Sequence, residues 1–169
     1  VGAGALNARS DLDLIVIYDA DGQDSSDGRR PLGARVYYTR LTQALVTALQ
    51  APMAQGRLFE VDMRLRPSGR QGPVAVSLAS FRNYQRDEAW TWEHLALTRA
   101  TPLAGPEPLC RAVDEVRDAV LAQDHARADV ARDVSEMRRR LHDARPRAAW
   151  EAKDGPGGLQ DIELLATAL

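Results

Sequence analysis

The sequence is poor in cysteine and in lysine, and it carries no excess of either charge. Cys110 is the only cysteine among 169 residues, which excludes a disulfide framework and a cysteine metal cluster and favours a reducing compartment such as the cytoplasm. Lys153 is the only lysine, so nearly all the positive charge belongs to arginine and is fixed at every accessible pH. The formal net charge is -2, so we expect no nucleic-acid partner.

Long apolar runs are also missing. No run approaches the roughly 20 residues that a membrane-spanning helix needs, so we expect no membrane partner. A basic segment followed by an apolar one, typical of a secretion signal, is absent as well. The sequence opens on Val1 rather than Met and stops at Leu169 within a helical pattern, which we interpret as an interior piece of a longer protein. Its length suffices for one large domain or two small ones.

The most informative stretch is a pair of carboxylates at the start of an apolar, β-branched run. Asp11 and Asp13 open a strand that we predict over residues 11–18. Side chains two residues apart on a strand point to the same face, so the two carboxylates can share a divalent cation. Gly2 and Gly4 lie just upstream, where a backbone can pass close to a phosphate. The alternative is a strand entered by two solvated aspartates.

A second strand is predicted over residues 57–66, because apolar and charged residues alternate there. Asp62, Arg64 and Arg66 share its polar face, which sets two fixed guanidinium groups beside a third carboxylate. Such surroundings suit a triphosphate held by a metal. An exposed edge strand has the same pattern, and that alternative stays open.

Helical spacing of apolar residues accounts for much of the remaining chain. It predicts helices over 31–50, from a cap at Ser77 or Ser80 to Arg99, and over 109–143, the last as one helix or as two with a break near Gln123. Three prolines and a glycine in residues 101–108 mark the best boundary. We therefore divide the chain into a domain over 1–105 and the start of an α-helical domain over 106–169.

Several downstream features have a structural interpretation that we prefer. The aromatic cluster at residues 90–94 is typical of helix packing, with adenine stacking as the alternative. We interpret the run Arg138 to Arg140 as a solvated helix face, with a phosphate-contacting or partner-binding patch as the alternative. The glycines at 157–158 are not followed by the lysine that ends a P-loop, so they do not form that phosphate-binding motif. Asp161 suits the first turn of a helix, where the helix dipole favours a negative charge.

Taken together, three carboxylates and the upstream glycines form one constellation. Three carboxylates can hold two Mg²⁺ ions roughly 3.5–4 Å apart, an arrangement that clamps the attacking and leaving oxygens in phosphoryl or nucleotidyl transfer. In this interpretation Asp11 and Asp13 hold both ions, and Asp62 completes the site and orients or deprotonates an attacking hydroxyl. Arg64 and Arg66 bind the nucleotide phosphates, and Ser10 contacts a phosphate through its hydroxyl or its backbone N–H.

These residues resemble a known family. Gly4 followed by Ser10-Asp11-Leu12-Asp13-Leu14 is similar to the nucleotidyltransferase signature of the polymerase-β-like superfamily. Four blocks resemble the bifunctional glutamine synthetase adenylyltransferases: Ser-Asp-Leu-Asp-Leu-Ile at 10–15, Val-Asp-Met-Arg-Leu-Arg-Pro-Ser-Gly at 61–69, Ala-Trp-Thr-Trp-Glu-His-Leu-Ala-Leu-Thr-Arg-Ala at 89–100 and Gly-Gly-Leu-Gln-Asp-Ile-Glu at 157–163. They stand in the family's order and cover nearly the whole chain.

The resemblance implies an α+β fold, with a polymerase-β-like mixed sheet and flanking helices, followed by an α-helical domain. It implies transfer of AMP from ATP to a tyrosine hydroxyl of glutamine synthetase, with Mg²⁺, and control by glutamine and the PII signalling protein.

The resemblance leaves the direction of the reaction open. The Trp-Thr-Trp-Glu-His block resembles the adenylylating C-terminal half of the family. The run Ala5-Leu6-Asn7 resembles the adenylyl-removing N-terminal half. Ala5 also stands where the family usually carries an acidic residue, and the loss of that acid favours a non-catalytic module. The alternatives are therefore phosphorolytic removal of AMP from adenylylated glutamine synthetase and a non-catalytic module that binds glutamine synthetase or PII.

Overall fold

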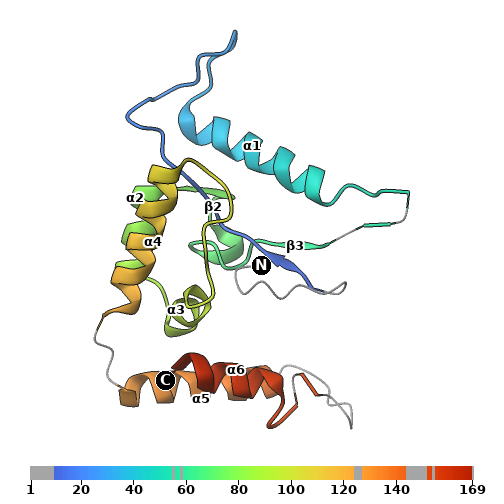
Figure 1. Ribbon diagram of the computed structural model, residues 1–169, viewed down its shortest axis with the longest axis vertical. Helices are drawn as coiled ribbons and strands as arrows, with labels where there is room; N and C mark the ends of the chain where they lie inside the picture. The colour runs from blue at the N-terminus through green and yellow to red at the C-terminus, as the bar shows by residue number, and fades with distance from the viewer. Residues whose placement is uncertain are drawn as a thin grey trace. The chain divides into compact units, whose positions relative to one another are not determined.

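The computed structural model describes residues 10–54, 56–57, 59–123, 127–143, 152–153 and 155–168. In chain order, Figure 1 shows the strands and helices β1 (Leu12–Asp13), β2 (Val16–Tyr18), α1 (Ala34–Leu49), β3 (Val61–Asp62), the short 3₁₀ helix η1 (Gly69–Gln71), β4 (Ala75–Ser77), α2 (Leu78–Asp87), α3 (Thr91–Leu97), α4 (Glu107–Leu121), α5 (Arg127–Asp143) and α6 (Leu159–Ala168). Helices combined with small parallel sheets make this an α+β structure, as predicted. Among the described helices, none has the length and apolar character of a membrane span.

The predicted strand over 11–18 is one extended segment that changes partner midway. Its first part, β1, pairs in parallel with β3, and its second part, β2, pairs in parallel with β4. The backbone N–H of Leu14 still donates to the carbonyl of Asp62 at 2.8 Å. The change of partner therefore follows Leu14.

The sheet differs from the prediction in two ways. The strand predicted over 57–66 is reduced to Val61–Asp62, because the chain turns directly afterwards through hydrogen bonds such as that from the N–H of Arg66 to the carbonyl of Met63. In the described part of the chain, the strands form two separate parallel pairs rather than one mixed sheet. Strand β4 was not predicted, because its three residues are too few to show a period.

Two compact units contain the described elements. The first holds the described residues up to Glu88 together with Thr101–Val116, and the second holds Ala89–Ala100 and the described residues from Arg117 onward. The domain boundary predicted between residues 105 and 106 stays a prediction.

The core of the first unit gathers around β4 and α2. Leu12, Ala75, Val76, Leu78 and Phe81 are all buried there. Helix α2 begins directly after β4, where the hydroxyl of Ser77 accepts a hydrogen bond from the N–H of Ser80 at 3.2 Å. Of the two predicted caps, Ser77 and Ser80, the structure has Ser77. This core holds β2 and β4 together and fixes the strand that leads into them from the acidic residues.

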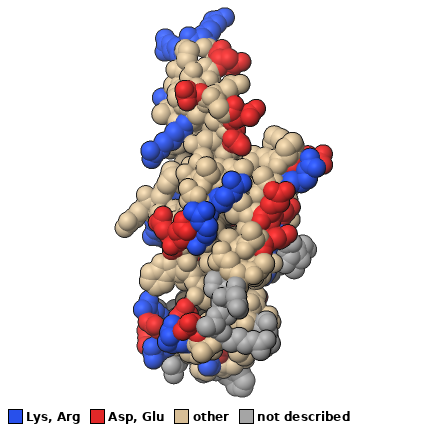
Figure 2. Space-filling view, turned by 90° about the vertical axis from the view of Figure 1, so that its left-hand side faces the viewer, with Lys and Arg blue, Asp and Glu red and all other residues tan. Residues whose placement is uncertain are grey.

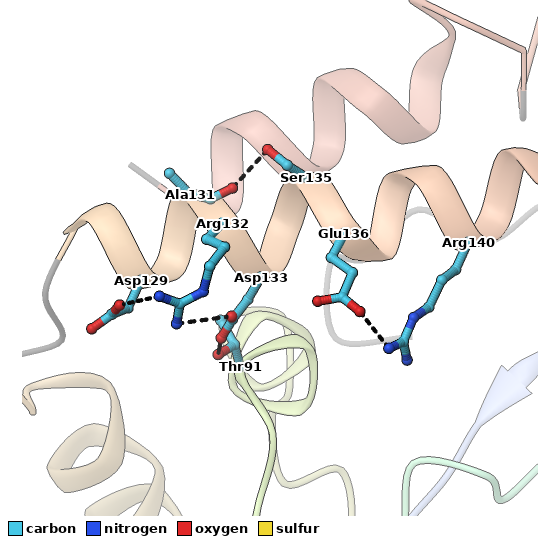
Figure 3. Close-up of polar contacts among 8 residues, drawn as sticks. All are labelled: Thr91, Asp129, Ala131, Arg132, Asp133, Ser135, Glu136 and Arg140. Carbon is cyan, nitrogen blue, oxygen red and sulfur yellow. Dashed lines mark hydrogen bonds and ion pairs between the residues drawn. The ribbon is translucent and has the colours of Figure 1, made fainter.

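The helix predicted from Ser77 to Arg99 is two helices. Helix α2 ends at Asp87, and the carboxylate of Glu93 accepts the N–H of Trp90 at 3.0 Å, which caps a new helix, α3. In the second unit, α3, α5 and α6 pack together. The Thr91 hydroxyl donates to the Asp133 carboxylate at 2.6 Å and joins α3 to α5 (Figure 3). Residues 109–143 also form two helices, α4 and α5, as one of the alternatives predicted.

A buried carboxylate, Asp161, fixes the glycine turn before α6. It accepts the N–H of Gly157 at 2.7 Å and pairs with the guanidinium of Arg138, also at 2.7 Å. These contacts hold its pKa below the usual range. A Cβ on Gly158 would lie 2.7 Å from the carbonyl oxygen of Ala152, so only glycine fits there. Asp161 stands in the first turn of α6, as predicted.

Replacing Asp161 by Asn tests this role. Loss of the charged hydrogen bonds should lower the free energy of unfolding at neutral pH by about 2 kcal/mol, measured by urea titration. Because the folded-state pKa is depressed, the stabilisation exists above the unfolded-state pKa and disappears as the pH falls through the folded-state value. The variant should therefore lose less stability on acidification. Glu163→Gln, in an exposed pair with Arg99, is the control and should change stability by under about 0.5 kcal/mol.

Candidate functional site

Pairing of β1 with β3 places two of the three predicted carboxylates side by side. Asp13 is the register partner of Asp62, and Leu12 is the partner of Val61. Residues in register on neighbouring strands project to the same face of a sheet, so the buried Leu12 faces one way and both aspartates face the other. Asp11 stands two residues before Asp13 and is exposed. We call Asp11, Asp13 and Asp62 the acidic triad.

Asp62 is held by Arg64 through both of its carboxylate oxygens. The backbone N–H of Arg64 donates to Oδ1 at 2.8 Å, and its Nε–H donates to Oδ2 at 2.6 Å. The Nη2 group of the same guanidinium also contacts Oδ2. The Asp62 side chain is 15% exposed, whereas that of Arg64 is 65% exposed. The carboxylate is therefore fixed in the protein, while the guanidinium that holds it lies in solvent.

The electrostatics of the acidic triad are unequal. Burial of its carboxyl group raises the pKa of Asp13, and the negative charges of Asp62 and Asp11 raise it further. The hydrogen bond from the Arg64 guanidinium lowers the pKa of Asp62, and the bond from the Arg64 backbone adds to this. Asp13 therefore lies close enough to Asp62 and Asp11 for their charges to disfavour its ionised form. A nearby cation would relieve that repulsion.

Arg66, predicted to lie beside Arg64, has different surroundings. It is 9% exposed, and its guanidinium donates to three backbone carbonyls, those of Met63 at 2.6 Å and of Arg70 and Gly72 at 3.3 Å. A Cβ on Gly72 would lie 1.9 Å from the carbonyl oxygen of Pro67, so the loop closes only around glycine. Arg66 thus builds the loop that follows β3. Its binding of phosphate stays a prediction.

The turn breaks the alternation that put both arginines on one strand face. The strand ends at Asp62, so Arg64 remains beside the carboxylates and Arg66 folds under the loop. The sequence analysis did not include Arg70, whose positive charge helps to lower the pKa of Asp62. Arg70 stands in η1, and no periodicity in the sequence links it to the acidic residues.

Of the remaining predicted site residues, the structure describes Ser10. Ser10, which precedes the first carboxylate, is half-buried. Gly2 and Gly4, with Ala5, lie outside the described residues, so the predicted glycine contact with phosphate stays a prediction. The roles of Ser10 and of the acidic triad stay predictions as well.

The chemistry of the acidic triad fits Mg²⁺, which prefers carboxylate oxygens together with phosphate oxygens of a substrate. Within residues 10–54, 56–57, 59–123, 127–143, 152–153 and 155–168, no three His, Cys, Asp or Glu side chains converge as a finished ligand group. Asp62 is engaged with Arg64 instead. A cation held by all three carboxylates therefore requires their side chains to rotate toward one another.

The features with a preferred structural interpretation lie in the second unit. Trp90 is 64% exposed at the start of α3, so this member of the aromatic cluster does not pack as predicted, and adenine stacking stays a prediction. On α5, Arg132 pairs with Asp129 and Asp133, and Arg140 pairs with Glu136 (Figure 3). In the face shown in Figure 2, basic and acidic side chains of described residues are interspersed.

Titration of the carboxyl groups by NMR tests the electrostatics of the triad. The pKa of Asp13 should lie above the usual aspartate value and that of Asp62 below it. Arg64→Gln should raise the pKa of both, because Arg64 lowers each of them. Arg86→Gln, which removes a similar exposed pair with Asp87, is the control and should leave both unchanged. An Asp62 pKa that is unaffected by Arg64→Gln would contradict the assignment.

Replacing Arg66 by Lys tests its role in the loop. An ammonium group cannot reach three carbonyls at once, so the free energy of unfolding should fall by about 2–3 kcal/mol, measured by urea titration. The matched change Arg70→Lys affects an exposed side chain and should cost under about 0.5 kcal/mol. Equal effects of the two changes would show that Arg66 does not build the loop.

Comparison with known proteins agrees with the blocks found in the sequence. Residues 1–116 match the family described as glutamate-ammonia ligase adenylyltransferase. Bifunctional glutamine synthetase adenylyltransferase/adenylyl-removing enzymes from Mesorhizobium japonicum and Brucella suis are 47% and 48% identical over 98% of the chain, and that from Rhizobium meliloti is 47% identical over 100% of it. The chain spans 17% of the length of each of these relatives. The chain belongs to the glutamate-ammonia ligase adenylyltransferase family.

Proposed function

We propose that this chain supplies catalytic carboxylates for the transfer of AMP from ATP to a tyrosine hydroxyl of glutamine synthetase. The observation that carries the proposal is the parallel register of β1 and β3, which sets Asp13 beside Asp62 in a member of this family. Names of the relatives support glutamine synthetase as the protein substrate. Regulation by glutamine and PII, and a cytoplasmic location, belong to the same proposal.

Each member of the acidic triad has a role in the proposal. Asp11 and Asp13 bind Mg²⁺, and Asp62 completes the set and accepts the hydrogen bond of the attacking hydroxyl. Two bound Mg²⁺ ions would neutralise the negative charge on the attacking and leaving oxygens. The tyrosine oxygen forms a bond to the α-phosphorus, and the bond to the bridging oxygen of pyrophosphate breaks. The hydroxyl proton passes to a carboxylate of the triad.

The arginines and Ser10 act on the phosphates. Arg64 is the best supported of these, because its guanidinium is solvent-exposed and adjacent to Asp62. Arg66 donates hydrogen bonds to backbone carbonyls, which supports an indirect contribution to phosphate binding: Arg66 fixes the shape of the loop after β3. Ser10 and the glycines Gly2 and Gly4 complete the phosphate contacts. This arrangement of strand-borne carboxylates supports the polymerase-β-like fold, which remains part of the proposal.

The adenylyl-removing reaction is a different step that can use the same carboxylates. In it, an oxygen of inorganic phosphate forms a bond to the phosphorus of the AMP group, the bond from that phosphorus to the tyrosine oxygen of adenylylated glutamine synthetase breaks, and ADP leaves. Both activities appear in the names of the relatives, and the run Ala5-Leu6-Asn7 favours this second candidate. A non-catalytic module is the third, and the intact acidic triad argues against it.

One assay separates the candidates. The chain, and a chimera in which it replaces the corresponding segment of the Mesorhizobium japonicum relative, are incubated with glutamine synthetase, Mg²⁺ and ATP labelled at the α-phosphate. Label should appear on the synthetase and be reduced at least about a hundredfold by Asp13→Asn, because loss of one metal-binding charge removes stabilisation of the transition state. Asp129→Asn, on an exposed residue of α5, is the control and should retain the activity.

A second reaction starts from synthetase that already carries labelled AMP. Release of label that depends on inorganic phosphate and on Asp13 would assign the chain to the removing reaction instead. No label transfer in either direction, from the chain or from the folded chimera, would contradict an enzymatic role.

A further inference from the structure

The strongest unexplained feature is that one residue satisfies both oxygens of a proposed metal ligand. Arg64 donates its backbone N–H to Oδ1 of Asp62 and its guanidinium to Oδ2. The guanidinium and a divalent cation therefore need the same oxygen. We propose that Arg64 is an exchangeable counter-ion of Asp62, displaced by the cation and then free to take a phosphate of the nucleotide. This inference rests on the proposed function.

The exposure of the Arg64 guanidinium makes exchange inexpensive. The Arg64 side chain is 65% exposed, so water can solvate the guanidinium when it leaves the carboxylate. A flexible arginine stem can move the guanidinium while the backbone bond to Oδ1 persists. The Asp62 carboxylate, 15% exposed, keeps its position for the arriving cation.

The charges of the surrounding residues favour the same sequence of events. The acidic triad and Arg64 together carry three negative charges and one positive charge. With Arg64 in place, one divalent cation at the carboxylates brings the local sum to zero, and the second ion of the proposed function makes it positive, so that the guanidinium is no longer needed there. A released guanidinium beside the site is then the nearest fixed positive charge for a polyphosphate. Metal binding and phosphate binding are thereby coupled through one side chain.

Arg66 cannot perform this exchange. Its guanidinium is bound to carbonyls within the loop after β3 and is 9% exposed. Arg70 acts on Asp62 only through the distance-dependent effect of its charge, since no hydrogen bond joins the two among the described contacts. Replacing Arg70 therefore removes only a nearby positive charge, whereas replacing Arg64 also removes the group that competes with the cation for the Asp62 oxygen. Arg70 is the control for this reason.

The test measures Mn²⁺ binding to the 169-residue chain by the loss of the free-ion EPR signal. Arg64→Gln should tighten Mn²⁺ binding about fivefold, because the competing ion pair is gone. Arg70→Gln should change it by less than about twofold, because it removes only a screened charge. Asp13→Asn should weaken binding at least about tenfold in either background.

A second measurement follows the Arg64 side chain directly. Its Nε–H resonance should be visible by NMR in the Asp62-bound form and should broaden into exchange with water as Mg²⁺ saturates the chain. Addition of an ATP analogue with a non-hydrolysable bond should then restore a protected signal in wild type, through the phosphate contact.

The outcomes separate the inference from the function on which it rests. Binding of Mn²⁺ that depends on Asp13, but with equal effects of Arg64→Gln and Arg70→Gln and an Nε–H signal that persists at saturation, would overturn the exchange and leave the proposed function standing. Binding that is insensitive to Asp13 would overturn the metal site itself.

Discussion

The parallel pairing of β1 with β3 is the constraint on which the candidate site depends. Each strand has only two residues, so the register needs support from outside the pair. That support comes from the buried residues of β4 and α2, such as Val76 and Phe81, and from the loop that Arg66 closes after β3. A slip of one residue would turn Asp13 and Asp62 to opposite faces. The buried residues of this unit thus support the geometry of carboxylates that are themselves close to solvent.

Sequence reasoning predicted the candidate site from local rules and erred where long-range contacts decide the structure. The spacing of Asp11 and Asp13, the helix cap at Ser77 and the first-turn position of Asp161 follow from local geometry, and the structure agrees with the cap and the helix turn. The change of partner after Leu14 does not show in the sequence. It depends on β4, a strand of three residues that no pattern marks.

The two arginines of Met-Arg-Leu-Arg-Pro illustrate the same limit. Alternation put Arg64 and Arg66 on one face, but alternation holds only while a strand continues, and β3 ends at Asp62. The Arg66 guanidinium is buried in a tight loop, where it donates to three backbone carbonyls. These charge-assisted hydrogen bonds replace those that it would make to water. The motif therefore divides its charges: one guanidinium serves the carboxylates and the other serves the loop that positions them.

The location of a bound cation tests the central claim most directly. Mn²⁺ titrated into the chain broadens the NMR signals of nearby residues, and the account predicts that the backbone signals of β1 and β3 broaden first. It also predicts that Asp13→Asn abolishes that selectivity. The acidic loop between Asp19 and Asp27 is the competing location, since its exposed carboxylates offer a solvated site without the strand register. Broadening that begins in this loop and is unchanged by Asp13→Asn would contradict the assignment of the acidic triad.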